Sequence, residues 1–279
     1  MPTSATRLVG LFGHPVAHSK SPQMHNAAFA HLSLDYSYLA FDVEPKRLQS
    51  AVESIRTLRM RGVNVTIPHK VAIIPYLDRL SREAELIGAV NTVVNDQGVL
   101  TGYNTDGIGY LSALEEETGF NVSGQRVLVL GAGGAARAVT VQLALRGTSE
   151  LVVAARTAEK AAGLVDELQA LTRSAALSWE AAAAQLDAYD LIINTTPVGM
   201  HPDDGALPIQ VERLRPGQVV SDLIYNPLHT RLLQEAKARG CITVGGLGMF
   251  IHQGAHAFAH WTGVDAPVDV MRRTVETCL

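Results

Sequence analysis

The chain has 279 residues, of which 47% are hydrophobic and 18% are charged, and its net charge is −4. Such a composition is typical of a globular protein with a sizeable core, and the length suits one large domain or two ordinary ones. The negative charge gives no electrostatic basis for binding nucleic acid or an anionic membrane, and no apolar run approaches the roughly 18 residues that a membrane span needs.

Cysteine usage and the start of the chain indicate a reducing compartment. The two cysteines, Cys241 and Cys278, suggest neither a disulfide framework nor a thiolate metal site. Residues 1–7 lead into an apolar stretch that is too short for a secretory signal. We therefore expect a cytoplasmic protein.

Apolar strands alternate with helical segments in the first third of the chain. One helix is expected to begin with Ser21 as N-cap and Pro22 at its first position. The next presents Leu48, Val52 and Ile55 on one face. Strands are predicted at 7–13, 36–43, 62–67, 89–94 and 99–102, the last two pairing across a turn at 95–98. This alternation favours a mainly parallel sheet.

From a helix that starts near Asp106, the alternation continues more regularly. Further strands are predicted at 127–130, 151–155, 191–195, 219–223 and 242–244. This pattern is typical of a doubly wound, Rossmann-like nucleotide-binding domain. We therefore predict an α/β chain of two domains, with residues 1–106 and a returning segment 246–279 in the first and residues 107–245 in the second.

A turn of glycine and alanine follows the strand at 127–130. Such small residues let the backbone approach a pyrophosphate, toward which the following helix directs its N–H groups. The alternative is a tight turn without a ligand. The strand before the turn and the helix after it are, however, the setting that a dinucleotide-binding motif requires. The turn residues are Gly131, Ala132, Gly133, Gly134 and Ala135.

The end of the next strand indicates which dinucleotide binds. NAD-binding domains usually place Asp or Glu there, to accept hydrogen bonds from the ribose 2′-hydroxyl. This chain has Arg156 and Thr157, with Lys160 nearby. A guanidinium can hold a 2′-phosphate through two hydrogen bonds, whereas in the alternative these cations only solvate a helix start. We predict NADP as the cofactor.

Hydroxyl and amide side chains gather in turn-like settings of the first domain. Neutral donors and acceptors suit a polyhydroxylated small molecule, for which one lysine and one aspartate could supply proton transfer. Amides at turns can also be simple turn formers. The side chains concerned are those of Ser19, Ser21, Asn64, Thr66, Lys70, Asn91, Asn104 and Asp106.

Seven short segments, taken in order, resemble the shikimate dehydrogenase family over nearly the whole chain. They are Ser19-Lys20-Ser21, the segments 64–70, 88–92 and 104–107, the glycine turn, and the segments 222–227 and 246–249. This family reduces the ketone of 3-dehydroshikimate to shikimate with NADPH, a step in the biosynthesis of aromatic amino acids through chorismate.

The resemblance implies a role for each matching residue. Lys70 and Asp106 would form the catalytic pair, in which the lysine protonates the alkoxide that hydride transfer produces. Gly246 would lie beside the nicotinamide, and Leu223 would also contact the cofactor. The implied substrate contacts are Ser19 and Ser21 to the carboxylate, Thr66, Asn91 and Gln253 to the ring hydroxyls, and Tyr225 in the pocket wall.

The sequence departs from the family pattern in two places. Ala155 stands where the family often has asparagine, which implies the loss of one contact to the adenosine ribose or its phosphate. His252 stands where the family often has a small residue. It shares a helical spacing with His256 and His260, but no carboxylate is interleaved, so we predict no metal site.

Other functions stay open at this point. The nearest is a quinate/shikimate dehydrogenase that uses NAD, against which Arg156 argues. A non-catalytic nucleotide sensor would have no use for Lys70 and Asp106. A reductase working through a covalent thiohemiacetal lacks a suitable cysteine motif. We expect a monomer or homodimer whose partner is a small molecule, without nucleic acid or membrane.

Overall fold

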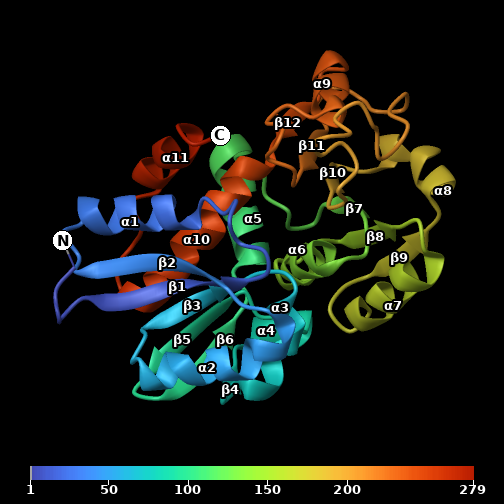
Figure 1. The fold of residues 1–279 in the computed structure, drawn as a ribbon. Helices are drawn as coiled ribbons and strands as arrows, with labels where there is room; N and C mark the ends of the chain where they lie inside the picture. The colour runs from blue at the N-terminus through green and yellow to red at the C-terminus, as the bar shows by residue number, and fades with distance from the viewer. Residues whose placement is uncertain (1) are drawn as a thin grey trace. The chain divides into compact units, whose positions relative to one another are not determined.

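The computed structural model describes residues 2–279, which divide into two compact units. The first unit runs to Thr105 and resumes at Ile251–Leu279, and the second is Asp106–Phe250. The second unit therefore opens on helix α5 (Asp106–Thr118), and the chain returns to the first unit within helix α10 (Gly246–Thr262) (Figure 1). Within residues 2–279, no helix combines the length and apolar character that crossing a membrane requires.

The first unit is built on a six-stranded sheet in the order β2-β1-β3-β5-β6-β4. Strand β1 runs parallel to β2 and β3, and β4 runs parallel to β6, whereas β5 is antiparallel to both of its neighbours. The sheet is thus mainly parallel, as predicted. Its strands are β1 (Arg7–Gly13), β2 (Tyr36–Asp42), β3 (Gly62–Val65), β4 (Arg79–Leu80), β5 (Thr92–Asp96) and β6 (Val99–Tyr103).

Apolar residues of the helices are buried together with residues of this sheet. Leu48, Val52 and Ile55 of α2 are buried in one cluster with strand residues, as their spacing predicted. The hairpin between β5 and β6 turns on Gln97 and Gly98 alone, so it is shorter than expected. The α-helices that lie wholly within this unit are α1 (Ser21–His31), α2 (Leu48–Thr57), α3 (His69–Ala72), α4 (Arg82–Ile87) and α11 (Val268–Glu276).

The start of α1 corrects one prediction. Ser21 is not the N-cap: the cap is Lys20, and Ser21 is already the first helical residue. The Ser21 amide instead donates to Ser19 Oγ at 3.2 Å. Pro22 lies in the first helical turn, where its missing N–H has no intrahelical partner in any case, so the helix can begin one residue earlier than expected.

The second unit carries an all-parallel six-stranded sheet in the order β12-β11-β10-β7-β8-β9. Reading outward from β7, three strands lie on one side and two on the other, which is the doubly wound order of a Rossmann-like fold. Its strands are β7 (Arg126–Leu130), β8 (Glu150–Ala154), β9 (Ser174–Leu177), β10 (Leu191–Asn194), β11 (Val219–Asp222) and β12 (Ile242–Val244).

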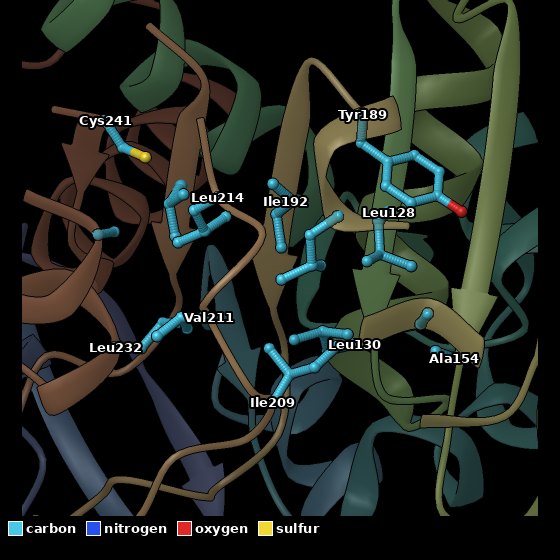
Figure 2. Close-up of a cluster of buried hydrophobic side chains, with 14 of the residues drawn as sticks. Leu128, Leu130, Ala154, Tyr189, Ile192, Ile209, Val211, Leu214, Leu232 and Cys241 are labelled. Carbon is cyan, nitrogen blue, oxygen red and sulfur yellow. The ribbon is translucent and has the colours of Figure 1, made fainter. Parts of the chain in front are cut away.

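One core of the second unit is formed by alternate strand residues. Leu128, Leu130 and Ile192 project from β7 and β10 into a cluster with Tyr189 and Leu232 (Figure 2). Because side chains alternate along a strand, the intervening residues face the opposite side of the sheet. The unit's remaining helices are α6 (Gly134–Leu145), α7 (Ala158–Leu168), α8 (Trp179–Ala183) and α9 (Arg231–Ala238).

An aromatic cluster in the first unit encloses a fully buried histidine. The His25 ring stacks on Tyr38 at 4.5 Å between centroids and also contacts Phe29, Phe258 and Trp261. Among residues 2–279, neither ring nitrogen has a hydrogen-bond partner. Burial lowers the pKa of His25 from 6.5 to about 3, because the charged form would lose its hydration without gaining a partner.

We expect His25 to weaken the fold in acid. Between pH 6.5 and 3 the unfolded chain binds a proton that the folded chain does not, so the free energy of unfolding falls as the pH falls. At about pH 4.5 this single group would cost about 3 kcal/mol, since each pKa unit corresponds to about 1.4 kcal/mol. Urea unfolding of the wild type and of His25→Phe, at about pH 7.5 and about pH 4.5, measures the difference.

The phenylalanine variant keeps the ring stacking and removes the titrating group. Asp78 also contributes to acid sensitivity, because hydrogen bonds from the Leu100 amide and Arg56 lower its pKa. It is present in both proteins, so the difference between them isolates His25. Equal losses of stability on acidification in both proteins would contradict the assignment.

Candidate active site

Lys70 is held by the backbone of a short helix that follows β3. The imidazole Nε2 of His69, its neighbour on α3, lies 2.7 Å from the Val43 carbonyl, and His69 itself is buried. The Lys70 carbonyl accepts a hydrogen bond of 2.8 Å from the Val90 amide, next to Asn91. These contacts fix the position from which the half-buried Lys70 side chain extends.

Thr66 begins the turn that joins β3 to α3. The predicted strand ends at Val65 rather than Ile67, because the Thr66 carbonyl accepts from the His69 amide at 2.9 Å and so starts a turn. The Thr66 amide still bonds to the Phe12 carbonyl at 2.9 Å. Its hydroxyl is therefore placed just beyond the carboxyl end of the strand, where ligands of such sheets bind.

Asn91 and Gln253 are brought together through Thr105. Asn91 Oδ1 accepts from the Thr105 amide at 2.8 Å, and Asn91 Nδ2 donates to Thr105 Oγ1 at 2.9 Å. The same Thr105 hydroxyl lies 2.9 Å from the main-chain carbonyl of Gln253, which is 148 residues away in the sequence. Two residues expected to bind one ligand thus share a hydrogen-bonding partner.

Ser21 and Tyr38 are both buried. Burial raises the pKa of Tyr38 well above its ordinary value, and the neighbouring Ser21 side chain opposes that rise, so the phenol stays protonated. Tyr38 in turn donates to Asn64 Oδ1 at 2.8 Å.

Asp106 is the first residue of α5 and the first residue of the second unit. Asp106 is only 9% exposed. A carboxylate at a helix N-terminus is stabilised by the N–H groups of the first turn and by the helix dipole. The covalent link to Thr105 means that the hydrogen bonds between Thr105 and Asn91 also restrain the backbone immediately before Asp106.

The glycine turn forms a cradle with open space above two of its residues. Gly131 has a φ of +110°, and a Cβ there would meet Thr195 Oγ1 at 2.6 Å, so only glycine fits. At Gly133 and Gly134, in contrast, an added Cβ would have no neighbour within 4 Å. Gly133 caps α6 without a side-chain hydrogen bond. The cradle therefore fits a pyrophosphate, with Ala132 and Ala135 as small flanking residues.

Arg156 lies beside this cradle in the same sheet. Strands β7 and β8 are paired neighbours, with Leu130 opposite Ala154, and the Gly131 amide donates to the Ala154 carbonyl at 2.7 Å. Arg156 and Thr157 follow β8 after one intervening residue, Ala155. Both are exposed, as is Lys160 of α7. Within residues 2–279 the Arg156 guanidinium makes no ion pair, so these residues fit a 2′-phosphate.

Leu223 and Gly246 meet at the other side of the same sheet. A Cβ on Gly246 would lie 2.1 Å from the Leu223 carbonyl oxygen, so glycine is required there too. The Gly246 amide donates to the Ile224 carbonyl at 3.1 Å. Tyr225 follows in this loop and stacks on Phe250 with ring centroids 5.4 Å apart.

A buried carboxylate holds the loops that follow β10 and β11. Asp222 accepts from Thr230 Oγ1 at 2.7 Å, from Asn194 Nδ2 at 3.0 Å and from the Ile224 amide at 3.2 Å. Burial raises the pKa of Asp222, and these three hydrogen bonds oppose the rise. The Asn194 carbonyl oxygen, Oδ1, accepts in turn from Thr196.

The predicted site residues thus divide between the two units. Ser19, Ser21, Thr66, Lys70, Asn91 and Gln253 belong to the first unit, whereas Asp106, Tyr225 and the expected cofactor-binding residues belong to the second. Within residues 2–279, no three His, Cys, Asp or Glu side chains are arranged to hold a metal ion.

Sequence reasoning missed several supporting residues. Tyr38, Thr92 and Thr105 have fully buried polar groups that bond to predicted site residues, and Asn194 with Asp222 fixes two loops. One signal was present, because polar residues within otherwise apolar strands need buried partners. The identity of those partners could not be read from spacing.

Three family descriptions match successive parts of the chain. Residues 11–93 match "Shikimate dehydrogenase substrate binding domain", residues 113–199 match "Shikimate / quinate 5-dehydrogenase", and residues 246–276 match "Shikimate 5'-dehydrogenase C-terminal domain". The order of these matches follows the alternation of the two units along the chain.

Individual relatives extend the similarity over almost the full length. The chain is 51% identical to a protein of Geobacillus kaustophilus named shikimate dehydrogenase (NADP(+)), covering 96% of this chain and 97% of that one. It is similar to a Listeria monocytogenes shikimate 5-dehydrogenase solved with shikimate and NAD, with 43% identity, a TM-score of 0.95 and 98% of both chains covered.

A third relative was solved with NADP(H) instead of NAD. A Thermus thermophilus shikimate 5-dehydrogenase solved with NADP(H) and shikimate has 40% identity and a TM-score of 0.89, over 98% of this chain and 100% of that one. The motifs, the doubly wound second unit and these similarities agree with one another. The chain belongs to the shikimate dehydrogenase family.

Proposed function

We propose that this protein catalyses the reversible, NADP-dependent interconversion of shikimate and 3-dehydroshikimate, within the biosynthesis of aromatic amino acids. The observation that carries the proposal is the polar group of Asn91, Thr105 and Gln253, joined through Val90 to the backbone of Lys70. It belongs to a chain that is 51% identical to a shikimate dehydrogenase (NADP(+)). Clustered hydroxyl and amide groups suit a ligand with several hydroxyls.

Lys70 and Asp106 are the catalytic pair in this proposal. During reduction, negative charge develops on the carbonyl oxygen as a hydride reaches the carbonyl carbon. The Lys70 ammonium stabilises that charge and donates the proton that makes the product hydroxyl, and in oxidation it takes the proton back. Asp106 orients the ammonium and keeps it cationic.

Substrate positioning falls to residues of the first unit and to Tyr225. Ser19 and Ser21 donate to the carboxylate, and Thr66, Asn91 and Gln253 bind the ring hydroxyls. Support for the serines comes from the Ser21 amide, whose bond to Ser19 Oγ holds the two residues close together. A site that hydrogen-bonds each hydroxyl can discriminate strongly against analogues that lack one.

The second unit would hold NADP, whose nicotinamide supplies the hydride when it is bound. Gly131, Gly133 and Gly134 would receive the pyrophosphate, and Arg156 with Thr157 and Lys160 would receive the 2′-phosphate. Leu223 and Gly246 would flank the nicotinamide. The open space above Gly133 and Gly134 supports the first assignment. The exposed guanidinium of Arg156, which makes no ion pair with any described residue, supports the second.

Initial rates with shikimate and quinate, each with NADP and NAD, test this function. We expect the highest kcat/KM with shikimate and NADP. A higher kcat/KM with quinate and NAD would favour a quinate dehydrogenase, and no turnover of either acid would reject the proposal. The Listeria relative was solved with NAD, so the cofactor comparison is informative in its own right.

We also propose a cellular location, a class of partner and an oligomeric state for the enzyme. Cys241 and Cys278 are both free thiols, which supports a reducing, cytoplasmic location. The net charge of −4 supports a protein that does not bind nucleic acid. We propose a monomer or homodimer, which sedimentation at several protein concentrations distinguishes.

A further inference from the structure

Six polar groups of the first unit form one continuous set of hydrogen bonds, here called the Tyr38–Gln253 network. Its side chains are fully buried or nearly so, and they come from strands, loops and a helix that are distant in the sequence. Its members are the side chains of Tyr38, Asn64, Thr92, Asn91 and Thr105 and the main-chain carbonyl of Gln253.

The proton positions in one half of the network follow from a single backbone donor. The Thr105 amide can only donate, so the Asn91 atom 2.8 Å from it must be Oδ1. The other amide atom, Nδ2, then donates to Thr105 Oγ1 at 2.9 Å. The Gln253 carbonyl can only accept, so the Thr105 hydroxyl directs its hydrogen to it at 2.9 Å, which is shorter than the 3.2 Å from that hydroxyl to Asn91 Oδ1.

The other half of the network follows from the same oxygen. Thr92 Oγ1 lies 2.9 Å from Asn91 Oδ1 and must donate to it. Thr92 then accepts from Asn64 Nδ2 at 3.1 Å, which leaves Asn64 Oδ1 to accept from the Tyr38 hydroxyl at 2.8 Å. The five side-chain donors therefore point in one direction, from Tyr38 to Gln253, while the Thr105 amide donates back to Asn91 Oδ1. Successive hydrogen bonds of this kind polarise and strengthen one another.

This direction determines what Asn91 can offer a ligand. Both lone pairs of Asn91 Oδ1 are occupied, by Thr92 Oγ1 and by the Thr105 amide. Asn91 can therefore turn only an Nδ2 hydrogen, and not its carbonyl oxygen, toward a bound hydroxyl. If the amide turned over, its NH₂ group would face two donors in a buried setting, which is costly.

We propose that Thr92 is a positioning residue for the substrate, which it orients by fixing the Asn91 amide within the Tyr38–Gln253 network. The inference rests on the proposed function of Asn91 and extends it. Thr92 is 0% exposed, so its side chain acts on a ligand only through its neighbours. Two proposed substrate residues, Asn91 and Gln253, thus share one set of hydrogen bonds.

Tyr38, the first donor of the network, is itself held rigidly. The Asn26 side chain bonds to both the amide and the carbonyl of Tyr38, at 2.8 and 2.9 Å. The His25 ring lies parallel to the Tyr38 ring, 4.5 Å away. Tyr38 therefore presents its hydroxyl to Asn64 in a fixed position, and Tyr38→Phe removes one hydrogen bond without removing the ring.

Steady-state kinetics of four variants test the proposal. Thr92→Val keeps the shape of the side chain and removes its hydroxyl, and it should raise the KM for shikimate roughly 10-fold, as expected for one lost buried hydrogen bond. The KM for NADP should stay at its wild-type value. Thr92→Ser restores the hydroxyl and should return the KM for shikimate to the wild-type value. Tyr38→Phe should raise that KM less than Thr92→Val, because Tyr38 lies two residues further from Asn91 along the network.

Thr148→Val is the matched control. Thr148 is a buried threonine of the second unit, and among residues 2–279 its hydroxyl bonds only to the Leu143 carbonyl, at 2.8 Å, so both KM values should stay unchanged. A purely structural role of Thr92 would raise the KM values for shikimate and NADP together or leave Thr92→Ser unable to restore binding, and either result overturns the proposal.

The remaining outcomes are also decisive. An unchanged KM for shikimate in Thr92→Val overturns the proposal, and if that variant does not fold, an unchanged KM in Tyr38→Phe does so. A wild-type enzyme that turns over no shikimate rejects the proposed function and the role of Thr92 with it. That failure is visible before any variant is made, so it is distinguishable from failure of the network alone.

Discussion

Replacing Lys70 with alanine is expected to lower kcat for shikimate oxidation by roughly 10²–10⁴-fold, the usual contribution of a positioned acid–base group. The substrate hydroxyl would lose the group that takes its proton, and the reverse reaction would lose the cation that stabilises the alkoxide. NADP binding should be nearly unchanged, because Lys70 belongs to the first unit and the proposed cofactor residues belong to the second. Stopped-flow or steady-state rates, with cofactor titration by fluorescence, measure both quantities.

Lys46→Ala is the matched control for this variant. Lys46 is a lysine of the same unit, but its side chain is 74% exposed and, within the described part of the chain, pairs only with Glu44, so its removal should leave kcat unchanged. A Lys70→Ala enzyme with near-normal turnover would contradict the catalytic assignment. A parallel loss of NADP affinity would indicate a wider structural effect.

The elements that the sequence predicted well carry their signal in adjacent residues. The strand at Arg7–Gly13 has the predicted bounds, and the glycine turn follows the expected strand and opens the expected helix. In each case a buried apolar run lies next to a residue with special backbone geometry. Because both features are local, a single sequence is enough to find them.

The elements that were missed are short, exposed or weakly apolar. Strand β9 (Ser174–Leu177) lies at the edge of its sheet and includes exposed alanines, so it lacks the apolar pattern of a central strand. Strand β4 (Arg79–Leu80) has two residues, too few for any periodicity. Their formation depends on pairing with a neighbouring strand, which is information that the segment itself does not contain.

The supporting residues of the site were missed for a different reason. Tyr38 bonds to Asn64 across 26 residues, and Thr105 bonds to Gln253 across 148. The sequence predicted the groups expected to touch the ligand, because they lie in short motifs. Their partners are fixed only when distant segments meet. Asn64 lies in a strand, as the predicted strand at 62–67 implied, and not in a turn, which was the alternative, but its partner Tyr38 could not be predicted.

Replacing Arg156 with aspartate is expected to weaken NADP binding by roughly 100-fold or more, since a charge-assisted hydrogen bond to phosphate contributes about 1.5–3 kcal/mol and the new carboxylate repels the phosphate as well. NAD has no 2′-phosphate, so its affinity should hold or rise, because the aspartate can accept from the ribose hydroxyl. Separate titrations with the two cofactors give the ratio of affinities, which is the quantity that decides the assignment.

The position of Arg156 makes this substitution easy to interpret. The residue is exposed and makes no ion pair within residues 2–279, so its removal leaves no buried group unsatisfied and should not alter stability. Arg213→Asp makes the same change of charge in the same unit, at an exposed residue whose ion partner is Asp187. It controls for a general change in the electrostatic field of that unit.

If Arg156→Asp weakened the binding of NADP and of NAD equally, the guanidinium would be acting on a part common to both cofactors, and the assignment to the 2′-phosphate would be wrong. A selective loss of NADP affinity would show that a single residue after β8 determines the preference for NADP over NAD. It would do so although Ala155 replaces the asparagine that the family often has at the preceding position.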